Sequence, residues 1–397
     1  MTSRADQDIA IVGIGATPYY PRGGSLPQTT NELLCKAIVA AANDAGIAVQ
    51  DIDGVALYAS AIAGWSETIE PGTLMETLGF RELGFTATLT GGGGGSAGAI
   101  GLAAAAIRNQ DARYVVSVMG LQQADPLRRL GKVILNKSLN PESAFLTPAS
   151  MPGPGHHMAM FARRHMHKYG TRREAFAEIA VMQRQYAMMH PNAVKRTPLT
   201  KEDYFAAPLI ADPMCIYDFC LETDGAVAVI TSSMDRARDL KQHPVRVAAA
   251  VHGAERGWGR SFQWMNMPDD LFASSGHRSL AKRVYEKAGL TPADIDVGFI
   301  YDHFTPMVVM QLEDYGFCPI GEGGPFVESG AVRMTGTLPI NPHGGQLSQG
   351  YILGMTHVIE AVMQLRHTAV NQVPGAEIAL VTGGPAYVPV SSLILRR

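Results

Sequence analysis

The feature of this sequence that most constrains its fold is an internal repeat. Residues 45–58 (AGIAVQDIDGVALY) recur as residues 288–301 (AGLTPADIDVGFIY), and six of the fourteen positions are identical. Two shorter similarities follow in the same chain order, pairing residues 96–100 with 348–352 and residues 115–119 with 378–382. Three similarities in one order indicate a duplication. The chain is therefore expected to hold one fold unit twice, with a pocket where the two halves meet.

Strand-like and helix-like segments alternate through both copies. Short apolar runs that end in glycine, such as IAIVGIG at 9–15, are typical of buried strands, and apolar residues three and four apart are typical of helices. We expect strands at 9–15, 55–58, 86–89, 114–119, 226–232, 245–251, 297–301, 377–382 and 388–395, and helices at 30–45, 96–108, 172–189, 279–288 and 350–365. The alternation predicts an α/β fold of two β-α-β-α-β halves, with parallel or mixed sheets around central helices.

The chain length also favours two units. At 397 residues the chain exceeds what one hydrophobic core usually serves. We expect a first half at residues 1–240 and a second half at residues 241–397. Residues 121–211 interrupt the alternation with a Pro/Gly-rich piece and a helical piece, and we interpret them as a cap inserted into the first half.

The composition excludes some classes of protein. The chain is 46% hydrophobic and 17% charged, with a net charge of −3, so it has no large basic field for nucleic acid. Its polar start lacks the apolar region of a signal peptide, and no apolar run is long enough to span a membrane. These features predict a cytoplasmic protein.

Cysteine and histidine spacing gives no metal signal. The cysteines lie far apart without a C-x-x-C pair, which is typical of reduced thiols rather than of disulfides or zinc ligands. The segment HHMAMFARRHMHKYG at 156–170 lacks the H-E-x-x-H spacing and a nearby carboxylate, so we interpret it as a helix with a basic face. No metal is expected. The four cysteines are Cys35, Cys215, Cys220 and Cys318.

A glycine run at residues 91–95 precedes a predicted helix. Gly93, Gly95 and Gly98 have the spacing of a dinucleotide-binding loop, but the next strand ends without the acid that would hold a ribose. The run also contains the G-x-S-x-G pattern of a serine hydrolase, centred on Ser96, although Ser96 is more simply the N-cap of the helix. Five glycines exceed what a turn needs, so we favour space cleared for a ligand.

Polar clusters follow the predicted strands of the second copy. Tyr301-Asp302-His303 ends a predicted strand, at the sheet edge where ligands bind in parallel sheets. Histidine and tyrosine there suit acid–base work, whereas the alternative is a hydrogen-bonded turn with Asp302 capping a helix. Asn341-Pro342-His343-Gly344-Gly345 runs into Ser348-Gln349-Gly350-Tyr351, and this glycine-rich loop favours a tyrosine that points into a pocket.

Four motifs resemble those of the thiolase superfamily, in particular its sterol-carrier-protein thiolase branch, and the likeness covers nearly the whole chain. In that branch the motifs are Cys-x-x-Gly, His-Asp-Cys-Phe, Gly-Gly…Gly-His-Pro and Cys-x-Gly-Gly. Here they read Gly95-Ser96-Ala97-Gly98, Tyr301-Asp302-His303-Phe304, Gly344-Gly345…Gly350-Tyr351-Ile352 and Val381-Thr382-Gly383-Gly384. The glycine framework is kept, but both catalytic cysteines and both catalytic histidines are replaced.

These replacements redirect the expected chemistry. Thiolysis needs a thiolate that carries the acyl group, so thiolase activity is excluded, and none of the four cysteines is expected to be catalytic. Two replacements are tyrosines, and the combination resembles the thiolase-like aldolases that cleave steroid side chains. The resemblance implies retro-aldol cleavage of a β-hydroxyacyl-CoA thioester, such as a 17-hydroxy or 22-hydroxy steroid side-chain ester. The products would be a steroid ketone or aldehyde and propionyl-CoA or acetyl-CoA.

The resemblance also implies which residues act. Tyr351 is expected to be the base at the β-hydroxyl and Tyr301 the donor to the enolate, with the roles exchangeable, and His303 and His343 are expected to assist. Substrate, CoA and oxyanion contacts are expected from Gly94, Gly95, Ser96, Asp302, Gly344, Gly345, Gly383 and Gly384.

Further expectations concern partners and other functions. The resemblance implies a homodimer that binds a small zinc-ribbon and OB-fold protein, as a heterotetramer, and the CoA thioester is the substrate, so no cofactor is expected. One alternative is a non-catalytic lipid or acyl-CoA carrier on the same scaffold. The other is a serine hydrolase that uses Ser96.

Overall fold

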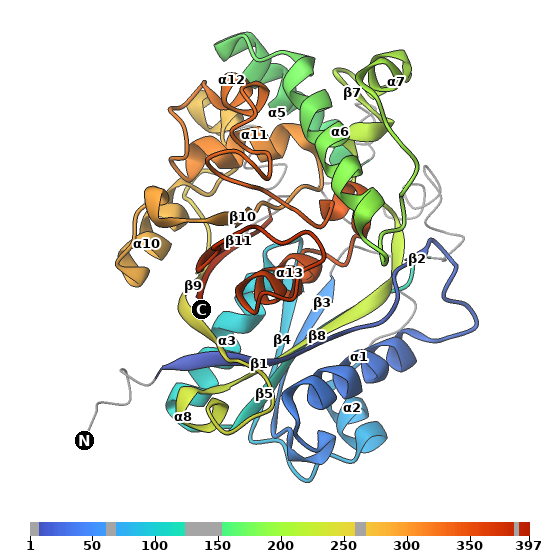
Figure 1. The fold of residues 1–397 in the computed structure, drawn as a ribbon, viewed down its shortest axis with the longest axis vertical. Coiled ribbons are helices and arrows are strands. Elements are labelled where there is room, and N and C mark those ends of the chain that lie inside the picture. Colours follow the sequence, from blue (N-terminus) through green and yellow to red (C-terminus); the bar gives the residue numbers. More distant parts are fainter. Residues whose placement is uncertain (1–7, 61–68, 124–152, 259–266, 385–388) are drawn as a thin grey trace.

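A computed structural model describes residues 8–60, 69–123, 153–258, 267–384 and 389–397 (Figure 1). The strands are β1 (Ile9–Ala16), β2 (Tyr20–Pro21), β3 (Gly54–Ser60), β4 (Phe85–Gly91), β5 (Tyr114–Leu121), β6 (Leu209–Ala211), β7 (Met214–Cys215), β8 (Thr223–Ser233), β9 (Val245–Gly253), β10 (Val297–Phe299), β11 (Ile378–Gly383) and β12 (Val390–Arg396). The α-helices are α1 (Thr30–Ala45), α2 (Pro71–Leu78), α3 (Gly95–Asn109), α5 (Pro154–Tyr169), α6 (Arg173–Met189), α7 (Lys201–Ala206), α8 (Met234–Ala237), α10 (Arg278–Ala288), α11 (Thr305–Asp314), α12 (Gly323–Glu328) and α13 (Met355–Leu365).

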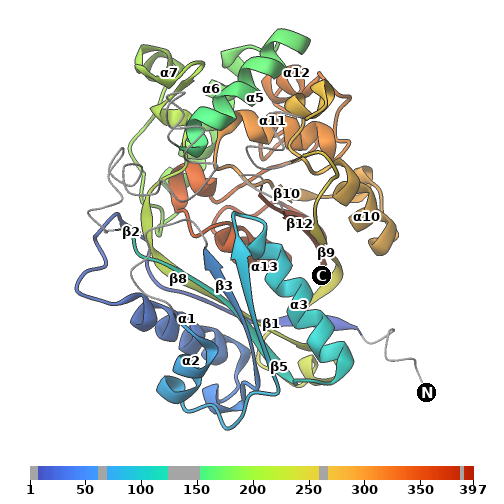
Figure 2. The ribbon, with the colours of Figure 1, turned by 180° about the vertical axis from the view of Figure 1, so that it is seen from behind.

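The strand order repeats in the two halves of the chain. The main sheet runs β4-β3-β5-β8-β1 and continues as β9-β12-β11-β10 (Figure 2). In the first half β3 and β5 are parallel and the β5–β8 and β8–β1 pairs are antiparallel; β10, β11, β12 and β9 repeat this pattern. Strands β1 and β9 join the halves as an antiparallel pair. The sheet is therefore mixed, and the parallel pairs are limited to β3, β4, β5, β10 and β11.

A repeated aspartate shows why the two halves fold alike. Asp53 precedes β3 and accepts hydrogen bonds from the backbone N–H groups of Arg113 and Tyr114, both at 2.8 Å, where β5 begins. Its counterpart Asp296 precedes β10 and accepts from the N–H groups that open β11, at 2.9 and 2.8 Å. Each carboxylate thus ties the start of one parallel strand to the start of its neighbour, because a carboxylate can accept several hydrogen bonds at once.

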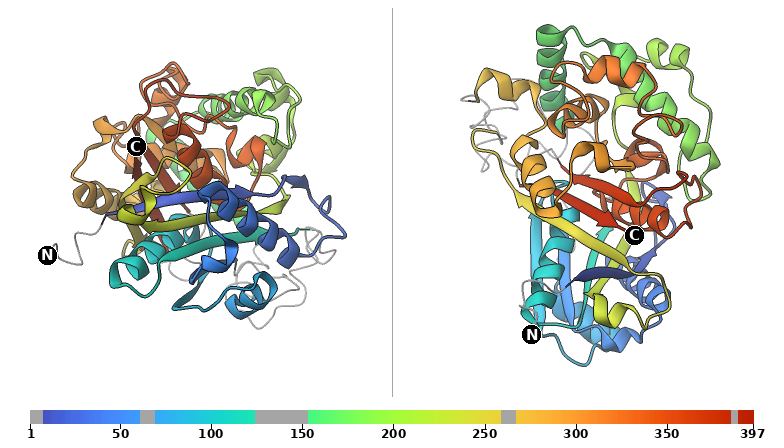
Figure 3. Two further views of the ribbon diagram at one scale, coloured as in Figure 1. Left: turned by 60° about the horizontal axis from the view of Figure 1, so that its bottom comes forward. Right: turned by 60° about the vertical axis from the view of Figure 1, so that its left-hand side comes forward.

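The apolar side chains of the described residues form three large cores around the two sets of strands, and a smaller fourth cluster lies at α5 and α11. Alternate residues of the first-half strands face α1 on one side and α3 on the other. Helices α3 and α13 share one core with strands of both halves, and α6, α10 and α11 pack on the outer face of the second-half strands. Figure 3 shows the first half, blue to cyan, and the second half, orange to red, in opposite parts of the molecule. This alternation follows from the two-residue period of side chains along a strand.

Helix boundaries follow local signals in the first half more closely than in the second. Helix α1 covers the expected residues, because Thr29 and Glu32 form a capping box at its start and Gly46 adopts a left-handed conformation at its end. The helix expected at 350–365 begins only at Met355. It is preceded by a short π-helical turn (η7, Gly345–Gln349) and by Leu353 at φ 47°, so that expectation is wrong for its first turn.

Helices α5, α6, α7 and α12 lie at the end of the molecule remote from α1 and α2 (Figures 1 and 2). The first three belong to the segment interpreted as a cap, whose residues 124–152 lie outside the described part of the chain. The boundary expected near residue 240 stays a prediction. Among the described residues, no helix is long and apolar enough to cross a membrane.

Candidate active site

Tyr301 is held by its backbone at the end of β10. Its N–H donates to Oγ1 of Thr382 in β11 at 2.8 Å, and its carbonyl oxygen accepts from Nε2 of Gln311 in α11 at 2.8 Å. Thr382 in turn donates to Oε1 of Gln311 at 2.6 Å. The side chain is 1% exposed. The second-half sheet and α11 therefore fix the position from which the phenol projects.

The phenol ring of Tyr301 lies on glycine backbone. A Cβ atom added at Gly93 would lie 2.1 Å from Cζ and 2.4 Å from the hydroxyl oxygen of Tyr301. A Cβ atom at Gly354, where φ is +83°, would lie 2.8 Å from the same ring. Two segments from different halves of the chain thus leave out side chains so that this ring can enter, which is one use of glycine at close approaches.

Tyr351 lies in the irregular segment between η7 and α13, and its backbone is tied to β8. Its N–H donates to Oγ1 of Thr223 at 2.9 Å, and this hydroxyl donates to the Tyr351 carbonyl oxygen at 2.9 Å. The side chain is partly exposed and packs at the rim of the central core. Tyr351 therefore enters the site from an extended loop rather than from a helix.

Tyr301 and Tyr351 form a hydrogen-bonded pair. Burial raises the pKa of Tyr301 well above its usual value, and its interactions with Tyr351 raise this pKa further. Tyr301 thus keeps its proton at neutral pH. A protonated phenol fits the expected role of Tyr301 as a hydrogen-bond donor.

The two glycine turns expected to hold an oxyanion lie side by side. A Cβ atom at Gly383 would lie 2.9 Å from the carbonyl oxygen of Gly93, and one at Gly384 would lie 3.5 Å from the nitrogen of Gly94. Gly384 also has a φ of +91°. The backbone after β11 therefore meets the backbone before α3 beside the Tyr301 ring.

Ser96 lies next to this junction but is buried and bonded to backbone. Its hydroxyl donates to the carbonyl oxygen of Gly93 at 3.0 Å, and its exposed fraction is 0%. Helix α3 begins at Gly95, with Gly94 as its N-cap and no side-chain cap, so the interpretation of Ser96 as N-cap is wrong. A hydroxyl donated to a carbonyl oxygen is not set up for attack by a neighbouring base.

Asp302 anchors a loop. It is fully buried and accepts from the N–H groups of Gln346 and Leu347 at 2.9 and 3.3 Å, and its Oδ1 lies 3.0 Å from Nε2 of His357. It does not cap α11, whose N-cap Phe304 makes no side-chain cap bond. Asp302 therefore holds η7, which leads to Tyr351, and its expected contact with the substrate stays a prediction.

The two predicted histidines lie in different surroundings. His303 is 3% exposed, and its ring lies 5.0 Å from the ring of Tyr301. His343 is stacked on Phe299, and its Nε2 lies 3.0 Å from Nδ1 of His357. Burial, and then His357, lower the pKa of His343 well below its usual value, so it is neutral at pH 7. The structure therefore brings His303 to the tyrosine pair and joins His343 to the buried Asp302–His357 chain.

Gly344 and Gly345 serve close packing. A Cβ atom at Gly344, with φ +101°, would lie 2.6 Å from Cβ of Ala187 in α6. At Gly345, with φ +61°, it would lie 2.0 Å from Oδ2 of Asp302 and 2.4 Å from Oε1 of Gln183. Both glycines let the backbone pack closely against buried side chains, and their expected contact with substrate or CoA stays a prediction.

Sequence reasoning missed several residues at this site. Tyr58, within β3, donates its hydroxyl to the carbonyl oxygen of Gly92 at 2.5 Å. Cys220 lies close enough to raise the pKa of Tyr301, and its N–H donates to the carbonyl oxygen of His303 at 2.9 Å. The internal repeat contained a signal for Tyr58, because Tyr58 aligns with Tyr301. Cys220 left no signal, since its contact is long-range.

His277 was also missed, and it supports the loop after β11. Its Nε2 lies 3.3 Å from the carbonyl oxygen of Gly383, and its Nδ1 lies 3.0 Å from the hydroxyl of Ser275. The Asp314 carboxylate accepts from that hydroxyl at 2.6 Å. Burial lowers the pKa of His277 to about 4.

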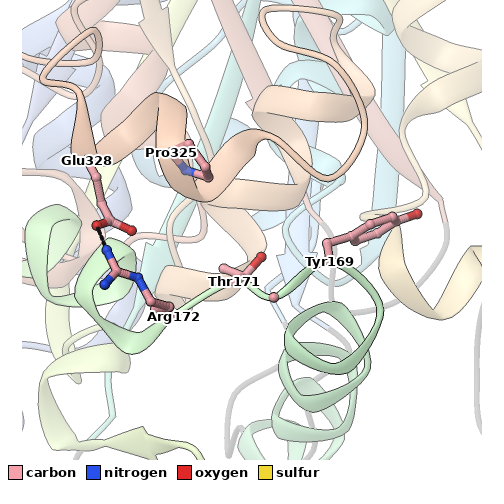
Figure 4. A pocket seen from close by; sticks show the side chains of 6 residues that line it. Tyr169, Thr171, Arg172, Pro325 and Glu328 are labelled. Carbon is pink, nitrogen blue, oxygen red and sulfur yellow. Dashed lines mark hydrogen bonds and ion pairs between the residues drawn. The ribbon is translucent and has the colours of Figure 1, made fainter.

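A separate small pocket lies between the cap helices and α12 (Figure 4). Its volume is about 170 Å³, and it contains an ion pair between Arg172 and Glu328. None of the residues discussed above lines it. Among the described residues, no group of three or more histidine, cysteine and acidic side chains is arranged to hold a metal ion. The pocket is lined by Tyr169, Gly170, Thr171, Arg172, Pro325 and Glu328.

Two known proteins are similar in sequence to this chain over nearly its full length. A 17-hydroxy-3-oxo-4-pregnene-20-carboxyl-CoA lyase of Mycobacterium tuberculosis is 36% identical over 97% of this chain and 98% of its own. The chain belongs to the steroid side-chain-cleaving aldolases of the thiolase superfamily. Another relative in this family, a steroid side-chain-cleaving aldolase of Thermomonospora curvata, is 34% identical over 97% of both chains. As a member of the family, the chain is a carbon–carbon lyase.

Two further comparisons agree with this membership. Residues 258–397 match the family model of a thiolase C-terminal domain-like fold. The solved structure of an Ltp2-ChsH2(DUF35) aldolase covers 98% of this chain and 97% of its own, with 33% identity and a TM-score of 0.87. The resemblance drawn from the motifs and the thiolase-like α/β fold are thus confirmed.

Proposed function

We propose that this aldolase cleaves the side chain of a steroid CoA ester that carries a β-hydroxyl group, of the 17-hydroxy or 22-hydroxy type. The products are a steroid ketone or aldehyde and propionyl-CoA or acetyl-CoA. The observation that supports this most directly is the hydrogen-bonded pair of Tyr301 and Tyr351 on the glycine turn, where Gly95 stands at the position of the nucleophilic cysteine of thiolases. The names of the two relatives point to the same substrate class.

The tyrosine pair suits the proton transfers of a retro-aldol reaction. Tyr351 takes the proton of the β-hydroxyl, the Cβ–O bond becomes a carbonyl, and the Cα–Cβ bond breaks. The electron pair of that bond passes into the thioester, which becomes an enolate. Tyr301 donates a hydrogen bond to the developing negative charge. The proton taken from the hydroxyl then returns to the α-carbon, so one turnover consumes no net proton and needs no external oxidant or reductant.

We further propose that the backbone N–H groups of Gly94 and Gly384 stabilise the enolate oxygen. These two glycines lie beside each other, and Gly94 is next in the chain to Gly93, which meets the Tyr301 ring. One preorganised backbone donor of this kind contributes on the order of a hundred- to thousand-fold in rate. No cofactor is required in this scheme, because the thioester itself accepts the electrons.

We propose that the chain works as a homodimer that binds a small zinc-ribbon and OB-fold protein, giving a heterotetramer. The similarity to the Ltp2-ChsH2(DUF35) aldolase supports a small partner. Strand β4 is the last strand at its end of the sheet, and an edge strand offers unpaired backbone groups to a second chain. Light scattering on the chain alone should give about twice 42.5 kDa, and a monomer would contradict the dimer.

The activity assay separates this function from a carrier. The purified chain, alone and with its copurified partner, is incubated with 17-hydroxy-3-oxo-4-pregnene-20-carboxyl-CoA, and the short acyl-CoA and the steroid ketone are quantified. Release of both in equal amounts supports the aldolase. Tight binding of the thioester without release would indicate a carrier instead. Loss of activity in Ser96→Ala, with normal folding, would favour a hydrolase.

A further inference from the structure

We infer that Tyr58 is a positioning residue of this aldolase, which holds residues 92–95 in the shape that receives the phenol of Tyr301. The inference rests on the proposed function, because Tyr301 is taken as part of the catalytic pair. Tyr58 comes from the first half of the chain and Tyr301 from the second, so the site would depend on one tyrosine from each copy of the repeat.

Tyr58 and Tyr301 occupy equivalent places in the duplicated fold. Each is the last residue of the repeated fourteen-residue segment. Each also lies five residues after the aspartate, Asp53 or Asp296, that ties the starts of two parallel strands. Tyr58 lies within β3, two residues before the strand ends, and Tyr301 lies two residues after the shorter β10, and both side chains are 1% exposed. Because β3 and β10 correspond in the strand order, the two rings approach the central helices from opposite halves.

The contacts of Tyr58 define its role. Its hydroxyl donates at 2.5 Å to the carbonyl oxygen of Gly92, which also accepts from the N–H of Gly95 at 3.3 Å and so closes the turn. Its ring also fills the space beside Gly95: a Cβ atom there would lie 2.1 Å from Cε2 of Tyr58. Gly95 is the position where the family motif has its nucleophilic cysteine. In this chain, Tyr58 occupies the volume that such a side chain would need.

The rings of Tyr58 and Tyr301 pack against two glycines of the same turn. Gly95 makes room for Tyr58 and Gly93 makes room for Tyr301, with one residue between them. The three phenols are also electrostatically coupled. After burial, the charge of Tyr351 is the next cause that raises the pKa of Tyr58, and both Tyr351 and Tyr58 raise that of Tyr301. A substitution at Tyr58 should therefore change the reaction rate by shifting residues 92–95 and, with them, Tyr301.

The first test removes only the hydroxyl. Tyr58→Phe keeps the ring beside Gly95 but breaks the hydrogen bond to the Gly92 carbonyl, so kcat should fall about 10- to 100-fold with KM little changed, as for a small misplacement of a catalytic group. In a Tyr301→Phe background, the same change should have almost no further effect on kcat, because the residue it positions is already lost. Tyr285→Phe is the matched control, since that buried tyrosine also donates to a backbone carbonyl, in Tyr315.

The second test does not depend on activity. Gly95→Ala should lower the Tm markedly, because the new methyl group meets the Tyr58 ring, whereas Gly95→Ala/Tyr58→Ala should melt no lower than Tyr58→Ala alone. An additive loss of Tm in the double variant would contradict the inference that the Tyr58 ring fills the space of a side chain at residue 95.

The outcomes separate the inference from the proposed function. If wild-type protein does not cleave the thioester, the proposed function fails, and the melting series still decides whether Tyr58 and Gly95 share one volume. If wild-type protein cleaves it and Tyr58→Phe acts as fast as Tyr285→Phe, the positioning role fails while the aldolase stands. An equal kcat loss with and without Tyr301 would also overturn it, because it would mean that Tyr58 does not act through Tyr301.

Discussion

The phenol of Tyr301 occupies the space that a side chain at Gly93 would fill. The built Cβ atom of residue 93 lies 2.1 Å from Cζ of Tyr301, well inside van der Waals contact. Residue 93 belongs to the first copy of the repeat and Tyr301 to the second. The glycine run before α3 therefore leaves the space in which the Tyr301 side chain, from the other half of the fold, packs.

Gly93→Ala tests this relationship. The methyl group would displace the Tyr301 ring, and a displacement of about 1 Å can cost on the order of a hundred-fold in rate. We expect kcat to fall by that amount and the free energy of unfolding to fall by about 1–3 kcal/mol from overpacking. Gly101→Ala is the control, because residue 101 lies in the helix that follows, α3, where the only neighbour within 4 Å of the added Cβ is Cβ of Ala250 at 3.3 Å. Equal effects of the two changes would contradict the account.

Much of the fold could be read from the sequence because local and repeated signals agreed. The capping box at Thr29 and the left-handed Gly46 set both ends of α1, as expected from the sequence. Two of the three repeated segments end in or form corresponding strands, β3 with β10 and β5 with β11. The third differs, because residues 96–100 belong to α3 whereas residues 348–352 lie in η7 and the loop before α13. Repetition reports on long-range structure because both copies must satisfy the same packing.

The parts that sequence reasoning missed depend on contacts between distant segments. The start of α13 was predicted too early, because Leu353 adopts a left-handed conformation that a leucine in the sequence does not predict. Asp302 looked like a ligand contact, yet η7 folds back and satisfies it with backbone N–H groups. Tyr58 looked like the end of a buried strand, and only the fold places it against Gly95.

The loop that leads to Tyr351 should be sensitive to a side chain at residue 345. In Gly345→Ala the methyl group would lie 2.0 Å from the Asp302 carboxylate at a φ of +61°, so we expect poor folding or a loss above about 3 kcal/mol from clash and strain. Gly375→Ala has a similar φ of +71° but nothing within 4 Å, so it should lose only about 1 kcal/mol. Urea unfolding of both variants measures the difference in the free energy of unfolding. Similar losses in the two variants would contradict the role of Asp302 in anchoring η7.

Cys220 should be dispensable for the reaction but close enough to block it. It lies near Tyr301 and is partly exposed, whereas no step of the proposed reaction uses a thiol. We expect Cys220→Ser to keep near wild-type turnover and iodoacetamide to slow the wild-type enzyme by adding bulk beside the tyrosine pair. The serine variant should resist the reagent. Loss of turnover in well-folded Cys220→Ser would instead indicate a catalytic thiol.

Stability should fall below neutral pH because of buried neutral histidines. The pKa of His277 is lowered to about 4 in the folded state, from 6.5, so its contribution is complete above pH 6.5 and is lost as the pH falls. The loss between pH 6.5 and about 4 is on the order of 3 kcal/mol for this residue. Urea unfolding at a series of pH values should show a shallower decline in His277→Gln. An unchanged slope would contradict the burial of a neutral imidazole at the Gly383 loop.

The central claim is that Tyr301 and Tyr351 perform the proton transfers of a retro-aldol cleavage. Its most direct test is the single-turnover rate of 17-hydroxy-3-oxo-4-pregnene-20-carboxyl-CoA cleavage by Tyr301→Phe, Tyr351→Phe and the double variant. Each single change removes one hydroxyl and keeps the ring, so the rate should fall about a hundred- to ten-thousand-fold while thioester binding changes far less. Because the two hydroxyls act as a hydrogen-bonded pair, the double variant should be little slower than the slower single one. Cleavage at near wild-type rates by both single variants would contradict the account and leave His303 as the nearest remaining candidate.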